Sequence, residues 1–193
     1  IINAIGISVA ITILSTVYPA LKGSRAVTPS LKRAWSFTTK PVGDEWEIPM
    51  PFRSSDTEEM GGIVTFLSEF LKNHEAWDSE IFKAHQPTYS ETETRDVTTR
   101  RLLCETRLEP YEQGIVQQTE IAFIRASSSP EWNMVIYVKR LAGSRAVWQS
   151  SNYSLCDEIR KQMLLWRALP KDEKEKYARL KEEMEDQAGK IQR

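Results

Sequence analysis

Residues 97–108 read VTTRRLLCETRL, and every second position from Leu102 to Leu108 is uncharged. The positions that alternate with them are mostly charged, namely Arg101, Glu105 and Arg107. A strand places successive side chains on opposite faces, so a period of two is typical of a strand with one buried face. The segment therefore predicts a half-buried strand, from which the neighbouring elements can be placed.

Two segments further along the chain, residues 114–125 and 131–141, have the same strand character. The second has an alternating apolar face made of Trp132, Met134, Ile136 and Val138. The sequences SSSP and AGS, which follow the two segments, supply turns. Residues 145–149, RAVWQ, are compatible with a short fourth strand. Together these segments predict a meander of three or four antiparallel strands.

Upstream of the sheet, residues 57–84 predict an amphipathic helix. Ser55 or Asp56 can cap its first turn, and a glutamate three positions on would complete a capping box. Apolar residues recur at the helical spacing of three and four, namely Met60, Ile63, Val64, Leu67, Phe70, Leu71, Trp77, Ile81 and Phe82. Gly61 and Gly62 would let this helix approach a neighbour closely. One helix laid across an antiparallel sheet is a compact α+β arrangement.

A second helix is expected to follow the sheet from Ser154, so the α+β domain is predicted to span residues 56–169. Beyond it, residues 170–193 predict a charged C-terminal helix or tail. Opposite charges four residues apart, such as Lys171 and Glu175, stabilise a solvated helix. We therefore expect this last segment to lie mainly in solvent.

The first 21 residues carry no charge and consist mainly of Ile, Val, Ala and Leu. About 20 apolar residues in a helix cross the hydrocarbon core of a bilayer. A secretion signal would begin with a basic region and have a shorter apolar run, and a soluble core helix would have a polar face. Residues 1–21 are therefore predicted to form a single transmembrane helix. Residue 1 is either a processed N-terminus or an internal point of a longer, multi-pass chain.

Basic residues follow this apolar run without an intervening acid, at Lys22, Arg25, Lys32, Arg33 and Lys40. Such residues remain on the cytoplasmic side of a membrane, or on the matrix or stromal side in an organelle. We expect a single-pass membrane protein, for example of the mitochondrial inner or plastid membrane, with its soluble domain on that side.

Residues 22–55 are expected to form an extended arm, because four prolines interrupt every helical or strand pattern. The arm is nevertheless rich in large apolar side chains, unlike a flexible linker. Large rings often anchor interfaces, and we expect four of them to bind a partner: Trp35, Phe37, Trp46 and Phe52. The alternative is that the arm lies on its own domain.

No catalytic residue, metal ligand set or cofactor site is expected. The two cysteines, Cys104 and Cys156, lie on apolar faces, and the two histidines, His74 and His85, lack the spacing of a zinc motif. With 26 Lys and Arg against 27 Asp and Glu, the formal net charge of −1 gives no support to nucleic-acid binding. The sequon at Asn152 is more consistent with a turn before a helix than with glycosylation.

The function expected from these features is that of a non-catalytic, membrane-anchored accessory or assembly subunit of a larger membrane protein complex. It would act through helix contacts in the bilayer and through docking of its arm and soluble domain. Its partners would be other membrane-protein subunits and the lipid bilayer, and not nucleic acid. The alternative is a C-terminal regulatory or ligand-binding domain of a multi-pass channel or transporter.

Overall fold

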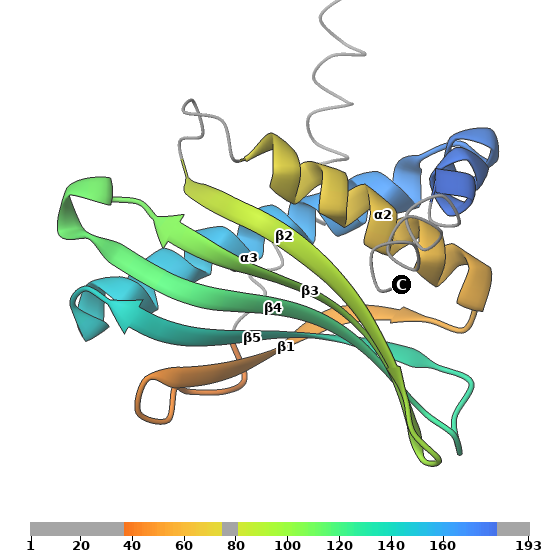
Figure 1. Cartoon of the computed structure of the whole chain (residues 1–193), viewed down its shortest axis with the longest axis horizontal. Coiled ribbons are helices and arrows are strands. Elements are labelled where there is room, and N and C mark those ends of the chain that lie inside the picture. Colours follow the sequence, from red (N-terminus) through yellow and green to blue (C-terminus); the bar gives the residue numbers. More distant parts are fainter. Residues whose placement is uncertain (1–36, 75–80, 181–193) are drawn as a thin grey trace, which may run out of the picture. The chain divides into compact units, whose positions relative to one another are not determined.

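The computed structural model describes residues 37–74 and 81–180, and a compact unit begins at Thr38. This unit is an α+β domain with a five-stranded antiparallel sheet (Figure 1). Its elements, in chain order, are β1 (Glu45–Ser54), α2 (Thr57–Asn73), β2 (Phe82–Glu93), β3 (Val97–Leu108), the 3-10 helix η1 (Tyr111–Gln113), β4 (Ile115–Ala126), β5 (Trp132–Ala142) and α3 (Arg145–Ala168). Residues 171–180 are also helical.

The strand order is β1-β5-β4-β3-β2, and all neighbouring pairs are antiparallel. The four strands β2 to β5 follow one another as hairpins, while β1 pairs with the last strand. The predicted α+β class and the three strands expected over residues 97–108, 114–125 and 131–141 are confirmed to within a few residues. The sheet has five strands instead of three or four, because both edge strands come from segments to which the sequence analysis gave another structure.

The first edge strand, β1, lies in the segment expected to be an irregular arm. Its side chains alternate between buried and exposed, and Trp46, Ile48, Met50 and Phe52 all point into the core. Pro49 and Pro51 lack the N–H group that a central strand needs. They are tolerated because β1 pairs only with β5, and the register between the two strands shifts from Pro49 to Arg53.

The other edge strand, β2, replaces the last part of the helix predicted over residues 57–84. Helix α2 ends at Asn73, and residues 75–80, including Trp77, lie outside the described residues. Phe82 begins the strand, and its ring stacks on that of His74 with 4.5 Å between centroids. The backbone N–H of Ala84 donates to the carbonyl of His74 at 3.1 Å, which fixes the start of the strand beside the helix end.

Helix α3 begins at Arg145, so the short strand considered for residues 145–149 and the helix start at Ser154 are both wrong. The buried residues of α3 recur at helical spacing: Trp148, Ser151, Asn152, Leu155, Cys156, Ile159, Met163 and Trp166. Five residues such as RAVWQ are too few to distinguish the helical period of about 3.6 residues from the strand period of two. The burial of Trp148 against the sheet decides in favour of helix.

Helices α2 and α3 both pack against one face of the sheet, which we call the covered face (Figure 1). Of the two predicted caps, Asp56 caps the start of α2, and its carboxylate accepts from the N–H groups of Glu58 at 2.8 Å and Glu59 at 3.2 Å. The predicted capping box is absent, because the N–H of Asp56 donates to Ser54 Oγ at 3.2 Å. Gly62 lies against Trp166, and a Cβ atom there would come within 2.7 Å of the indole. The close approach expected of this glycine pair is thus made at Gly62.

The helical residues 171–180 bear the predicted ion pair between Lys171 and Glu175, at 3.7 Å. They are not wholly solvated, because Tyr177 packs edge-on against Phe66, with 5.4 Å between ring centroids, and also contacts Trp166. Residues 181–193 lie outside the described residues.

Within residues 37–74 and 81–180, no helix combines the length and the apolar character that a membrane crossing requires. The segment predicted to span the membrane, residues 1–21, lies outside this part of the chain.

Candidate functional site

The four rings expected to bind a partner have different positions. Trp35 lies outside the described residues, and Phe37 is half-buried. Trp46 and Phe52 are only 4% exposed each and belong to the core of the domain. Their burial leaves too little surface to anchor a partner, which corrects the prediction for these two residues. For residues 45–54 the alternative holds, because this stretch lies on its own domain as strand β1.

Trp46 makes several side-chain contacts that connect strand β1 with the rest of the domain. Its indole contacts Trp148 at 6.1 Å between ring centroids and Tyr153 at 5.9 Å. Its Nε1 donates to the hydroxyl of Thr39 at 3.1 Å. The ring therefore joins the edge strand to helix α3.

The two cysteines are buried free thiols, Cys104 on the covered face of β3 and Cys156 on helix α3. Burial raises the pKa of the Cys104 thiol to about 12 and also raises the pKa of Cys156. The thiolate is the reactive form of cysteine. Neither position therefore favours nucleophilic chemistry at neutral pH.

The two histidines have different surroundings. His74 lies between Phe70 and Phe82, and its Nδ1 is 2.8 Å from the carbonyl oxygen of Phe70. His85 is an exposed residue of β2. In the described part of the chain, no three His, Cys, Asp or Glu side chains gather in a way that could hold a metal ion.

A fully buried polar network connects α3 with the sheet. Gln117 accepts from Trp148 Nε1 at 2.6 Å and from Asn152 Nδ2 at 2.9 Å, and it donates to Asn152 Oδ1 at 3.0 Å. Its amide also donates to Thr119, whose hydroxyl is 2.7 Å from that of Thr106. Asn152 is helical and inaccessible, so its sequon cannot be glycosylated in the folded domain, and the turn expected there is absent.

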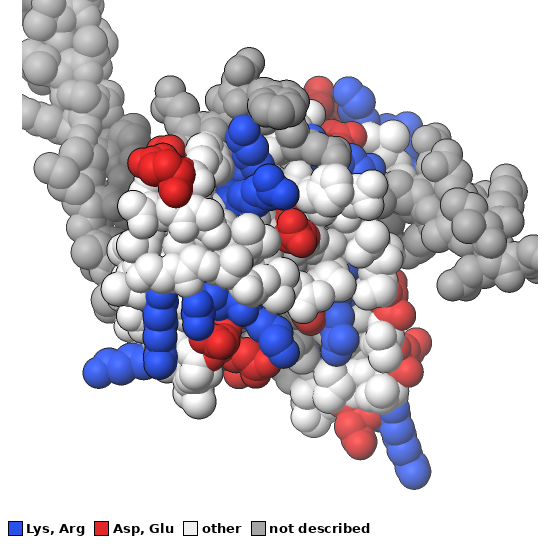
Figure 2. All heavy atoms as spheres, turned by 60° about the vertical axis from the view of Figure 1, so that its left-hand side comes forward, with Lys and Arg blue, Asp and Glu red and all other residues white. Residues whose placement is uncertain are grey.

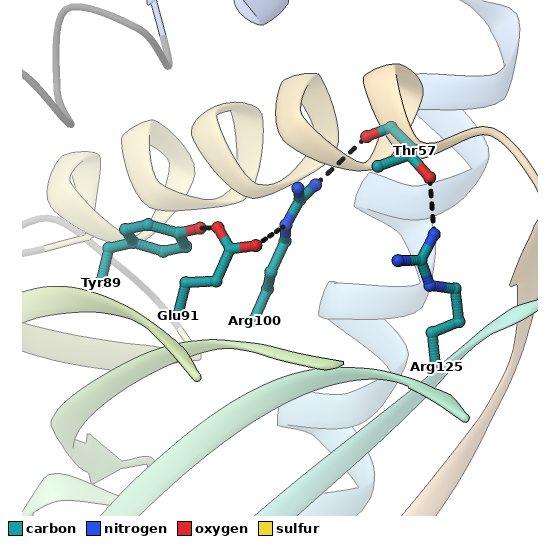
Figure 3. Close-up of polar contacts among 5 residues, drawn as sticks. All are labelled: Thr57, Tyr89, Glu91, Arg100 and Arg125. Atoms are coloured by element: carbon teal, nitrogen blue, oxygen red, sulfur yellow. Dashed lines mark hydrogen bonds and ion pairs between the residues drawn. The ribbon is translucent and has the colours of Figure 1, made fainter. Parts of the chain in front are cut away.

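A second polar cluster lies where α2 begins (Figure 3). The guanidinium of Arg100 bonds to Glu91 at 3.1 Å and to the backbone carbonyl of Thr57 at 3.1 Å. Arg125 donates to the Thr57 hydroxyl at 2.9 Å, and Tyr89 donates to Glu91 at 2.7 Å. Because Arg100 is buried and its charge is paired, we interpret this cluster as a support for the helix start.

The opposite face of the sheet, which we call the open face, is covered by none of the helices in the described residues (Figure 1). It is hollowed by a groove of about 850 Å³, formed by strands β1, β3, β4 and β5 and by residues 39–42. The partly exposed apolar side chains of Leu103 and Ile124 lie on the floor of the groove, over the fully buried Ala122.

Charged side chains surround this floor as pairs of opposite sign. Arg101 lies 3.3 Å from Glu120, and Lys139 lies 3.0 Å from Glu45. On the side shown in Figure 2, basic and acidic side chains are likewise interspersed, with uncharged surface between them. The groove is therefore amphipathic and has no strong net charge.

Tyr137 occupies the centre of the groove. Its cross-strand neighbours are Glu47 on β1 and Glu120 on β4. Burial, followed by Glu47 and Glu120, raises the pKa of the phenol, and Arg101 partly opposes this shift. Both carboxylates therefore act on the same ring.

Sequence reasoning missed this groove. Arg101 and Glu105 of β3 stand at the charged positions of an alternating pattern, which is also the pattern of an ordinary solvated face. Glu45 and Glu47 were assigned to the arm. The alternation of apolar with other residues from Trp46 to Phe52 was the sequence signal for a strand here, with Glu45 and Glu47 on its other face.

No known protein family, curated protein or solved structure matches the chain.

Proposed function

We propose that this protein is a non-catalytic, membrane-anchored accessory subunit whose domain docks onto another membrane-protein subunit through the open face of its sheet. The observation that carries the proposal is the amphipathic groove centred on Tyr137. Interfaces combine an apolar centre with a polar rim, and the groove has both.

The size of the open face fits this role. Five strands spaced by about 4.8 Å, each of about ten residues at ~3.4 Å, give a face on the order of 700 Å². One partner in a standard protein interface contributes about 800 Å². The open face alone is therefore close to the area that a stable subunit contact needs.

The non-catalytic part of the proposal rests on the residues that most often carry chemistry. The thiols are buried with raised pKa values, and His74 lies between two phenylalanine rings. The membrane anchor rests on the uncharged residues 1–21 and the basic residues after them.

The groove also favours one alternative, a regulatory or ligand-binding domain at the end of a multi-pass channel or transporter. Its volume of about 850 Å³ lies within the range of roughly 300–1,000 Å³ that small-molecule sites occupy. A bound small molecule found by native mass spectrometry would favour this alternative.

The test is purification of the full chain in mild detergent, with chemical cross-linking through Lys139 and Lys40 at the groove. We expect a stoichiometric subunit cross-linked to these lysines. Tyr137→Arg should release it without changing the melting temperature, because a charged, longer side chain would obstruct the groove.

The matched control is Leu165→Arg, which adds the same charge at an exposed position of α3. It should leave the partner bound. The proposal is wrong if Tyr137→Arg retains the partner, or if the wild-type chain is recovered without any stoichiometric subunit.

A further inference from the structure

Within the groove, acidic side chains lie on both sides of the Tyr137 ring. Antiparallel cross-strand neighbours have Cβ atoms about 5 Å apart, and Tyr137 has a glutamate on both sides, Glu47 and Glu120. The face of an aromatic ring is itself electronegative and attracts ammonium and guanidinium groups. The face of the Tyr137 ring and the two carboxylates therefore both attract a cationic group.

The two carboxylates are not equally engaged. Glu120 is 27% exposed and is paired with Arg101. Among the ion pairs of the described residues none includes Glu47, although its neighbour Glu45 is paired with Lys139. Of the two carboxylates beside the ring, Glu120 is therefore held in an ion pair, whereas Glu47 is exposed to solvent.

The surroundings of this centre indicate a polypeptide ligand. The apolar side chains of Leu103 and Ile124, which are partly exposed, line the same groove as Tyr137. An extended segment with a basic side chain over Tyr137 could place apolar residues two positions away on the same side, against these groups. A small free cation would leave the floor uncovered.

We propose that the groove binds an extended segment of a partner subunit by accepting one lysine or arginine side chain over Tyr137, beside Glu47. This inference rests on the proposed function, since it names the chemistry by which the open face recognises its partner.

The experiment measures binding of a fluorescent acetyl-Val-Ser-Lys-Ser-Val-amide peptide to the full chain in uncharged detergent micelles, by fluorescence anisotropy. In this peptide the lysine and both valines lie on the same face of the extended chain. The same peptide with glutamate in place of lysine is the charge control. We expect the lysine peptide to bind and the glutamate peptide to bind at least tenfold more weakly.

Variants of the groove locate the site. Glu47→Gln should weaken binding of the lysine peptide about three- to fivefold, the effect expected for one partly exposed ion pair. Tyr137→Leu should weaken it by a similar or larger factor, whereas Tyr137→Phe, which keeps the ring face, should restore wild-type affinity. The matched control is Glu105→Gln, an exposed carboxylate of β3 outside the groove, which should have no effect.

Three results would overturn the inference: equal affinity for the two peptides, equal effects of Glu47→Gln and Glu105→Gln, or tetramethylammonium binding as tightly as the lysine peptide. The last would identify a site for a free small cation. None of these results bears on whether a cross-linked subunit is recovered, so the inference can fail while the proposed function stands. Failure of the proposed function is recognised separately, by the absence of that subunit.

Discussion

The two faces of the sheet are made by alternate residues of the same strands, yet they have opposite characters. On the covered face, side chains such as Ile121 and Ile136 are fully buried beneath α2 and α3. On the open face, their sequence neighbours Glu120 and Tyr137 border a groove. The comparison shows that the role of a strand residue in this domain depends on which face of the sheet it points to as much as on its residue type.

Two pairs of identical residues at consecutive positions show this dependence most directly. Gln117 is fully buried and belongs to the polar network, while Gln118 is exposed. The side chain of Arg100 is 8% exposed and that of Arg101 is 45% exposed. Each pair offers a substitution and its control within one dipeptide, and the following predictions use this, from the largest expected effect to the smallest.

The largest difference is expected for apolar neighbours on β5. Ile136→Ala should lower the free energy of unfolding by about 2–5 kcal/mol, because truncation of a fully buried side chain leaves a cavity. Val135→Ala, on the open face, should cost about 1 kcal/mol or less. Urea unfolding of the full chain, followed by tryptophan fluorescence, measures both. Similar losses at the two positions would show that the open face is buried in this preparation.

An intermediate difference is expected for the glutamine pair. Gln117→Leu removes the acceptor of Trp148 Nε1 and Asn152 Nδ2. A buried donor left without a partner costs about 1–3 kcal/mol, so the variant should lose about 2–4 kcal/mol. Gln118→Leu should change stability by less than about 0.5 kcal/mol. A stable Gln117→Leu variant would mean that the network adds no net stability.

The smallest difference is expected for the arginine pair, measured as coupling energies in two double-mutant cycles. The coupling of Arg100 with Glu91 should be about 1–2 kcal/mol, since Arg100 is buried and hydrogen-bonded. The coupling of Arg101 with Glu120 should be about 0.2–1 kcal/mol, as for exposed ion pairs. Raising the salt concentration should weaken mainly the second pair. Equal couplings, with equal salt dependence, would contradict the distinction between the faces.

Local patterns predicted much of this fold correctly. The alternation of residues 97–108 indicated a strand, the spacing of Met60, Ile63 and Leu67 indicated a helix, and Asp56 capped it as expected. The predictions were wrong in two segments in which one local pattern conflicts with another. The prolines of β1 hid its alternation, and the apolar residues near Phe82 continued a helical pattern into a strand.

The sequence by itself determined the α+β class, three of the five strands, the first part of the helix predicted over residues 57–84 and the burial of the cysteines, because these depend on periodicity within one segment. Only the tertiary structure decided that β1 pairs with β5, although 78 or more residues separate the paired positions. It also decided that Gln117 meets Asn152, and that Glu47, Tyr137 and Glu120 form one row on the open face. Pairing between distant strands follows from the burial of complete faces under two helices, which no single stretch of sequence specifies.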